Sequence, residues 1–114
     1  MESGSIVEGF VEECNFQRAI LNKTLIKKSE VTKSDFRGVV AKQGRFEYSL
    51  FEECSFVGIN LFRGSLRRMD MKICDFSHSN LYAVEMYKTK LFEVNFSGAN
   101  LKKSMLENRV NLIE

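Results

Sequence analysis

The sequence places an apolar residue at every fifth position from Ile6 to Leu106, and this period constrains the fold more than any other feature. An α-helix advances about 100° per residue, so a five-residue apolar period would drift around its surface. In a β-strand, where side chains alternate between two faces, the same period would change face at every repeat. A chain that turns a corner every five residues can point all these side chains at one axis. The period therefore predicts a solenoid.

A second column lies two positions before each large apolar residue and consists mostly of small residues, such as Ser79 and Ala99. The two positions after each large residue are mainly charged or polar, as in Arg67-Arg68. We expect the large and small columns to face the axis and the polar pairs to face water.

The spacing that gives the most uniform columns sets the number of sides. A spacing of twenty residues aligns five phenylalanines and four leucines with one alanine, Ala41, whereas a spacing of fifteen mixes phenylalanine with valine and leucine. Twenty residues per turn predicts four sides, and the length of the repeat predicts about five coils. The predicted core stack consists of Phe16, Phe36, Phe56, Phe76, Phe96, Leu21, Leu61, Leu81 and Leu101.

Several motifs carry a family resemblance: Ser34-Asp35-Phe36, Cys74-Asp75-Phe76, Ser79-Asn80-Leu81 and Ala99-Asn100-Leu101. They resemble the A-(D/N)-(L/F)-x-x unit of the pentapeptide-repeat family, and the phase continues through almost the whole chain. The resemblance implies an all-β fold, a right-handed quadrilateral parallel β-helix with tight turns at its corners. The handedness comes from the resemblance alone.

Asparagine or aspartate often stands directly before the large apolar residue. Short polar side chains of this kind bond nearby backbone groups in turns, so we expect them to hold the corners. The residues concerned are Asn15, Asp35, Asn60, Asp75, Asn80, Asn95 and Asn100.

The chain of 114 residues is predicted to form one domain, with repeats over residues 1–109 and a cap or dimerisation segment over residues 110–114. The repeat phase fails after Leu106, and an uncapped last coil would leave strand edges and core open. Some members of the family dimerise through this end, which implies a homodimer. The candidate dimer interface consists of Leu106, Val110, Leu112 and Ile113.

The sequence contains neither a long apolar run nor a basic start followed by an apolar segment, so we expect a cytoplasmic protein that does not enter a membrane. Cys14, Cys54 and Cys74 form no CxxC pair and, with the single His78, offer no zinc spacing. All three fall in the small column beside the phenylalanines, so we expect buried free thiols.

No catalytic motif accompanies these residues. His78 follows Phe76 by two positions and is predicted to point outward. The sequence has no glycine-rich phosphate loop and no nucleophile with a base at motif spacing. We therefore predict no enzyme activity, no catalytic residue, no metal site and no cofactor.

Charges are spread along the chain, which has a formal net charge of +2 and no polybasic run, so a nucleic-acid partner is not expected. Charges alternate in sign along two outward columns, which predicts opposite charges meeting between successive coils. The columns are Lys27, Glu47, Arg67, Tyr87 and Glu107, and Glu13, Lys33 and Glu53. A more biased patch offers either a solvated face or a site for an anionic partner. It consists of Arg45, Arg67, Arg68, Lys88 and Lys90.

Phe62 and Tyr82 lie twenty residues apart in an outward column, and Tyr48, Tyr87 and Phe92 are also predicted to point outward. Such aromatic residues either form a protein-binding stripe or stack on one another as packing of the sheet. The candidate partner surface consists of Phe62, Tyr82, Arg67, Arg68 and Lys88.

Two functions follow from this interpretation. The favoured one is a non-enzymatic protein-interaction scaffold that binds an unidentified macromolecular partner through its outer faces. The alternative, implied by the resemblance, is a DNA mimic that modulates type II topoisomerase, as in quinolone resistance. A DNA mimic needs a largely negative surface, whereas this chain is net positive.

Overall fold

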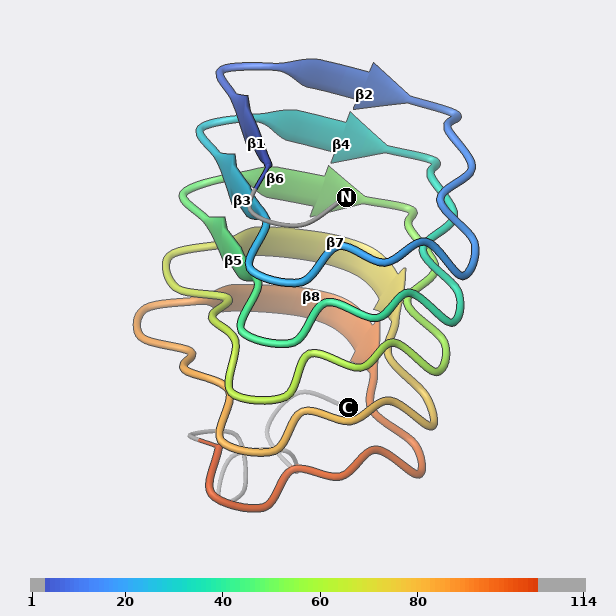
Figure 1. Ribbon diagram of the computed structural model, residues 1–114, viewed down its shortest axis with the longest axis vertical. Helices are drawn as coiled ribbons and strands as arrows, with labels where there is room; N and C mark the ends of the chain where they lie inside the picture. The colour runs from blue at the N-terminus through green and yellow to red at the C-terminus, as the bar shows by residue number, and fades with distance from the viewer. Residues whose placement is uncertain (1–3, 105–114) are drawn as a thin grey trace.

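The computed structural model describes residues 4–104, which form a stack of coils with short parallel strands on two of its sides (Figure 1). The principal extents of the molecule are 31 × 22 × 22 Å. The strands within this range are β1 (Ser5–Val7), β2 (Phe10–Glu12), β3 (Leu25–Lys27), β4 (Glu30–Thr32), β5 (Arg45–Glu47), β6 (Leu50–Glu52), β7 (Asp70–Asp75) and β8 (Lys90–Asn95).

The strands form two parallel sheets whose register is twenty residues throughout. One sheet has the order β1-β3-β5 and the other the order β2-β4-β6-β7-β8. Ile26 of β3, for example, pairs with Ile6 on one side and with Phe46 on the other. Each of the first three coils contributes one strand to each sheet, whereas the fourth and fifth coils contribute β7 and β8 to the second sheet and only isolated bridges to the first side. Equivalent residues of successive coils lie one above another, as Figure 1 shows.

Isolated parallel bridges with the same register form the other two sides of the coil. The structure thus has four sides for every twenty residues, which confirms the predicted four-sided β-solenoid of about five turns. The right-handed sense stays a prediction. Along the chain the sides are the first (5–7, 25–27, 45–47, 65–67, 85–87), the second (10–12, 30–32, 50–52, 70–72, 90–92), the third (15–17, 35–37, 55–57, 75–77, 95–97) and the fourth (20–22, 40–42, 60–62, 80–82, 100–102).

Every corner places one residue at positive φ, at each fifth position from Glu8 to Lys103. Only three of these positions are glycines, so most corners hold a residue with a side chain in the left-handed region, which L-residues disfavour. Ile73, with φ of 55°, is the most unfavourable because it is β-branched. At Arg18 the corner amide donates to the Arg37 carbonyl of the next coil at 2.9 Å, so inter-coil bonding holds the conformation.

The asparagine and aspartate side chains lie at the corners and accept a bond from the backbone N–H two residues later, as predicted. The N–H of Gln17 donates to Asn15 Oδ1 at 2.8 Å, and that of Phe62 donates to Asn60 Oδ1 at 3.2 Å. The same bond is made by Asp35, Asp75, Asn80, Asn95 and Asn100. Their side-chain oxygens therefore hold the backbone in place.

The core is filled by the large column and its small partners. Successive phenylalanine rings of the third side stack with centroid separations of 4.6 to 5.6 Å, which is the range of favourable offset stacking. Of the predicted core stack, Phe16 and Leu101, at its two ends, are only partly buried. The buried members are Phe36, Phe56, Phe76, Phe96, Leu21, Leu61 and Leu81.

The expectation of three buried thiols is wrong for Cys14, which is exposed, while Cys54 and Cys74 are buried. Cys14 lies in the first coil, where the equivalent position of the next coil, Ser34, adjoins it from one direction only. Loss of hydration on burial raises the pKa of Cys54 to about 11 and that of Cys74 to about 12.

The proposed cap at residues 110–114 and the candidate dimer residues Leu106, Val110, Leu112 and Ile113 lie outside the described residues. Residues 4–104 contain no helix long and apolar enough to cross a membrane.

Candidate interaction surfaces

The part of the chain that the structure describes holds no group of three or more His, Cys, Asp or Glu side chains placed to bind a metal ion. His78 is exposed at a corner of the third side, where its ring lies against the position a Cβ of Gly98 would take. The two low-reactivity thiols, Cys54 and Cys74, point into the core. The charged and aromatic side chains that could contact a partner therefore lie on the outer surface, distributed over the four sides of the coil.

The second and fourth sides face opposite ways, and they carry opposite charge. We call the fourth side with its flanking corner residues the acid-free face, because it has five basic side chains and no acidic one. Its basic residues are Lys23, Lys42, Arg63, Lys102 and Lys103, within residues 19–23, 39–43, 59–63, 79–83 and 99–103. The second side with its flanking corner residues carries Glu12, Glu13, Glu30, Glu52, Glu53, Asp70 and Glu93 against Lys33, Lys72 and Lys90.

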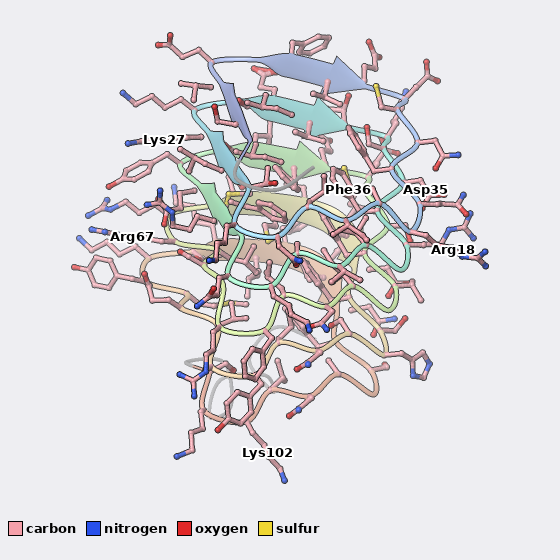
Figure 2. The ribbon with its side chains drawn as sticks, viewed as in Figure 1. Arg18, Lys27, Asp35, Phe36, Arg67 and Lys102 are labelled. Atoms are coloured by element: carbon pink, nitrogen blue, oxygen red, sulfur yellow. The ribbon has the colours of Figure 1, made fainter. Side chains whose placement is uncertain are left out.

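A groove follows the corner between the first and second sides and has a volume of about 540 Å³. We call it the corner groove. Figure 2 shows the neighbouring Lys27 and Arg67 projecting from this edge of the stack, with Asp35 and Arg18 at the opposite edge. The groove is lined by Lys28, Ser29, Glu30, Tyr48, Ser49, Leu50, Arg68, Met69, Asp70, Lys88 and Lys90.

Two exposed tyrosines organise the cations beside the corner groove. The guanidinium of Arg68 lies between the rings of Tyr48 and Tyr87, at 5.9 and 5.6 Å from their centroids. Lys27 approaches the Tyr48 ring at 5.6 Å. Arg67 and Lys88 approach the Tyr87 ring at 5.7 and 5.4 Å. Cations and aromatic rings therefore alternate along the corner, each cation within the distance of a cation–π interaction.

This arrangement corrects the expected ladder of opposite charges. In the column of Lys27, Glu47 and Arg67, the two cations contact tyrosine rings, and no ion pair joins the column within residues 4–104. The ion pair in that range joins Arg37 and Asp35 on the third side, at 2.8 Å. The bonds from Arg37 hold the pKa of the Asp35 carboxyl below its usual value.

On the acid-free face, the rings of Phe62 and Tyr82 stack with centroids 5.4 Å apart and planes inclined by 13°. The Arg63 guanidinium lies 5.3 Å from the Phe62 centroid and 5.9 Å from that of Tyr82. Both rings are half-buried. Of the two interpretations of this pair, a protein-binding stripe or mutual stacking, the geometry is that of mutual stacking. A hollow of about 270 Å³ adjoins the stack and is lined by Lys42, Asn60, Phe62 and Asn80.

The candidate partner surface therefore separates into two places. Arg67, Arg68 and Lys88 lie together at the corner groove, whereas Phe62 and Tyr82 lie one side away on the acid-free face. Sequence reasoning predicted that Tyr48 and Tyr87 point outward, which the structure confirms, but it did not join them to the cations. The twenty-residue spacing of Lys28, Tyr48, Arg68 and Lys88 was the available signal.

Comparison with known proteins agrees with this architecture. Residues 70–108 match the pentapeptide-repeat family as eight copies of the repeat. Residues 70–108 therefore consist of pentapeptide repeats. The same period and register extend back through the described coils to Ser5, beyond the matched segment. No curated protein matches the chain at a significant level.

Solved structures of pentapeptide-repeat proteins have a similar fold. The chain resembles the pentapeptide-repeat protein Rfr23 from the cyanobacterium Cyanothece 51142, with a TM-score of 0.58, 12% identity and coverage of 90% of this chain and 88% of that one. It also resembles QnrB1, a plasmid-mediated fluoroquinolone resistance protein, with a TM-score of 0.56 and 20% identity. That match covers 86% of this chain and 49% of QnrB1, so the chain spans about half of the length of QnrB1.

Proposed function

We propose that this protein is a non-enzymatic interaction scaffold that binds an extended, acidic segment of a partner protein in the corner groove. The observation that carries the proposal is the alternation of Tyr48, Arg68 and Tyr87 beside the groove. Tyrosine and arginine are the residue types most often responsible for binding energy at protein interfaces. Here each ring holds cations in place before a partner arrives, which lowers the entropy lost on binding.

The composition of the groove fits a protein segment better than a uniformly charged polymer. Lys28, Arg68 and Lys88 offer bonds to carboxylates, while Glu30 and Asp70 would repel a continuous row of phosphates. Leu50 and Met69 add apolar surface between the charges. A segment that alternates acidic and apolar residues would match both properties.

The surface charge also separates this proposal from a DNA mimic. A mimic that competes for a DNA-binding saddle needs negative charge along its length. In this chain only the second side has an acidic excess, and the first and fourth sides are predominantly basic. The likeness to QnrB1 at 20% identity concerns the fold, and the charge pattern supports the scaffold.

The experiment is a fluorescence-anisotropy titration with a labelled peptide of about ten alternating glutamate and leucine residues. Residues from the second to the fifth coil span about 15 Å, so such an extended peptide is long enough to follow the groove. We expect the doubly substituted Arg68→Glu/Lys88→Glu protein to bind at least tenfold more weakly, with slower association and a weaker dependence on salt, because both residues are exposed charges.

The matched control is Arg18→Glu/Lys33→Glu, because both residues are exposed corner cations with positive φ like Arg68 and Lys88 but lie outside the groove. It should bind the peptide like the unsubstituted protein. Absence of binding to the unsubstituted protein would refute the choice of an acidic partner. Equal weakening by both double substitutions would show a general charge effect and remove the groove as the site.

A further inference from the structure

The acid-free face differs from the corner groove in carrying one sign of charge only. Lys23, Lys42, Arg63 and Lys102 are exposed and belong to the first, second, third and fifth coils, so they extend along the length of the stack. Between these cations the face presents asparagines and aromatic rings and no carboxylate. A polyanion laid along this face meets no acidic side chain of the face itself.

The middle of the acid-free face provides a stacking platform. Phe62 and Tyr82 are already parallel to within 13°, and Arg63 lies beside both rings. The hollow of about 270 Å³ next to Phe62 has Lys42 at its wall. A flat aromatic group entering the hollow contacts the edge or face of Phe62, and its attached phosphate is within reach of a flexible lysine.

The amides of Asn60 and Asn80 give the hollow its polar groups. Asn80 Nδ2 donates to Asn60 Oδ1 at 3.3 Å. The backbone N–H of Phe62 also donates to Asn60 Oδ1, and the backbone N–H of Tyr82 donates to Asn80 Oδ1. The amides are thereby held in a fixed ladder. Fixed amide groups are suited to hydrogen bonds with the edge of a nucleobase.

We propose that the acid-free face binds single-stranded nucleic acid, with one nucleobase in the hollow beside Phe62 and the phosphates along Lys42, Arg63 and Lys102. Cations combined with a stacking platform are the features by which proteins bind single strands without strong sequence preference. The absence of acidic residues favours phosphates over an acidic peptide here, in contrast to the groove that contains Glu30 and Asp70.

This proposal departs from the expectation that the sequence raised. A net charge of +2 without a basic run argued against nucleic acid because charge was considered over the whole chain. The fold sorts the charges, since each side collects residues twenty positions apart and the acidic residues of the second side face away from Lys42 and Arg63. A weakly charged chain therefore has one strongly basic side.

The number of cations limits the strength and sets the salt dependence. With five basic residues on the face, at most about five phosphates are neutralised, and the slope of log K against log salt is then between about −2 and −3.5. Binding should weaken roughly 20- to 100-fold between 50 and 200 mM salt, because a slope in that range acts over a fourfold change in concentration.

The experiment is an anisotropy titration with fluorescein-labelled dT10 and rU10 at several salt concentrations. Replacing two cations in Lys42→Ala/Arg63→Ala should weaken binding and reduce the slope by about 1.4, the value for two phosphate contacts. The control Lys33→Ala/Lys72→Ala on the second side should change neither the affinity nor the salt slope. Phe62→Leu should weaken binding about fivefold or more with the slope unchanged, because it removes stacking and no charge.

The unlabelled competitors identify the ligand. A nucleic-acid site is supported if other unlabelled single strands displace dT10 and uridine monophosphate competes far more weakly. Tighter binding of the glutamate–leucine peptide to this face, loss of dT10 binding in the Lys33→Ala/Lys72→Ala control, or a salt slope near zero overturns it. Because the Arg68→Glu/Lys88→Glu protein keeps the acid-free face, its dT10 binding should fall less than threefold, so the two proposals fail separately.

Discussion

The first coil and the central coils carry the same five-residue pattern but have different environments. Phe56 is fully buried between two other phenylalanine rings, whereas Phe16 of the same column is partly buried and stacks on one ring. Cys54 is 3% exposed, while Cys14 is exposed. Phe10 of the first coil is 67% exposed, whereas Leu50, in the same column of the third coil, is half-buried.

The comparison teaches that the period decides the direction of a side chain, while the neighbouring coils decide how far it is buried. In a solenoid each coil contacts only the coils next to it, so an end coil lacks half of these contacts. Residues of one column therefore differ in energetic importance according to their place in the stack.

The largest difference is expected for the phenylalanine column. Phe56→Ala should lower the free energy of unfolding by about 3 to 5 kcal/mol, because it leaves a cavity between the rings of Phe36 and Phe76. Phe16→Ala should cost about 1 to 2 kcal/mol, since its ring is only partly removed from water. Chemical denaturation followed by circular dichroism measures both, and equal losses would contradict the comparison.

The thiols should separate the same two regions by reactivity. The thiolate is the reactive form, and burial raises the pKa of Cys54 to about 11 and of Cys74 to about 12. At pH 8 we expect Cys14 to react with a disulfide reagent on the order of 100-fold faster than either buried thiol. Cys14→Ser should remove the fast phase, and a fast phase that survives this substitution would contradict the assignment.

The smallest effect should be the same in both regions. Glu53 of the third coil has φ of 56°, and Glu53→Gly should raise the free energy of unfolding by about 1 kcal/mol because glycine adopts this conformation freely. Glu13, with φ of 54°, stands at the same corner of the first coil. Glu13→Gly should give a similar gain in a urea titration, because backbone strain is local. A gain confined to Glu53 would show that strain, too, depends on place in the stack.

Much of the fold could be predicted from the sequence because one period specifies both the turn and the core. The phenylalanine column and the bonds of Asn15 and Asn60 at the corners follow from the position of each residue within five. The four sides followed from the uniformity of the phenylalanine column at a spacing of twenty. These features depend on repeated neighbours, which the sequence lists directly.

Other features depend on geometry that the pattern does not contain. The positive φ at every corner was signalled by Gly38, Gly58 and Gly98 alone, since the remaining corners hold residues of every kind. The contacts of Arg68 with two tyrosine rings depend on long side chains that cross between columns, so column-by-column reasoning paired Arg67 with Glu47 instead. The basic side could have been found by adding charges within each column.

The common register of twenty residues has a consequence for how such a chain can change over generations. Duplication of a whole coil would lengthen every side by one step and leave the charge of each side as it was. Duplication of five residues would keep the apolar phase, so the core would still close, but every later residue would move one quarter-turn around the axis. Beyond that point, the residues that formed the basic side would lie on a neighbouring side, and so would those that formed the acidic side. A single short insertion could thus exchange one set of surfaces for another, although it would also interrupt the stacked phenylalanine column at that point.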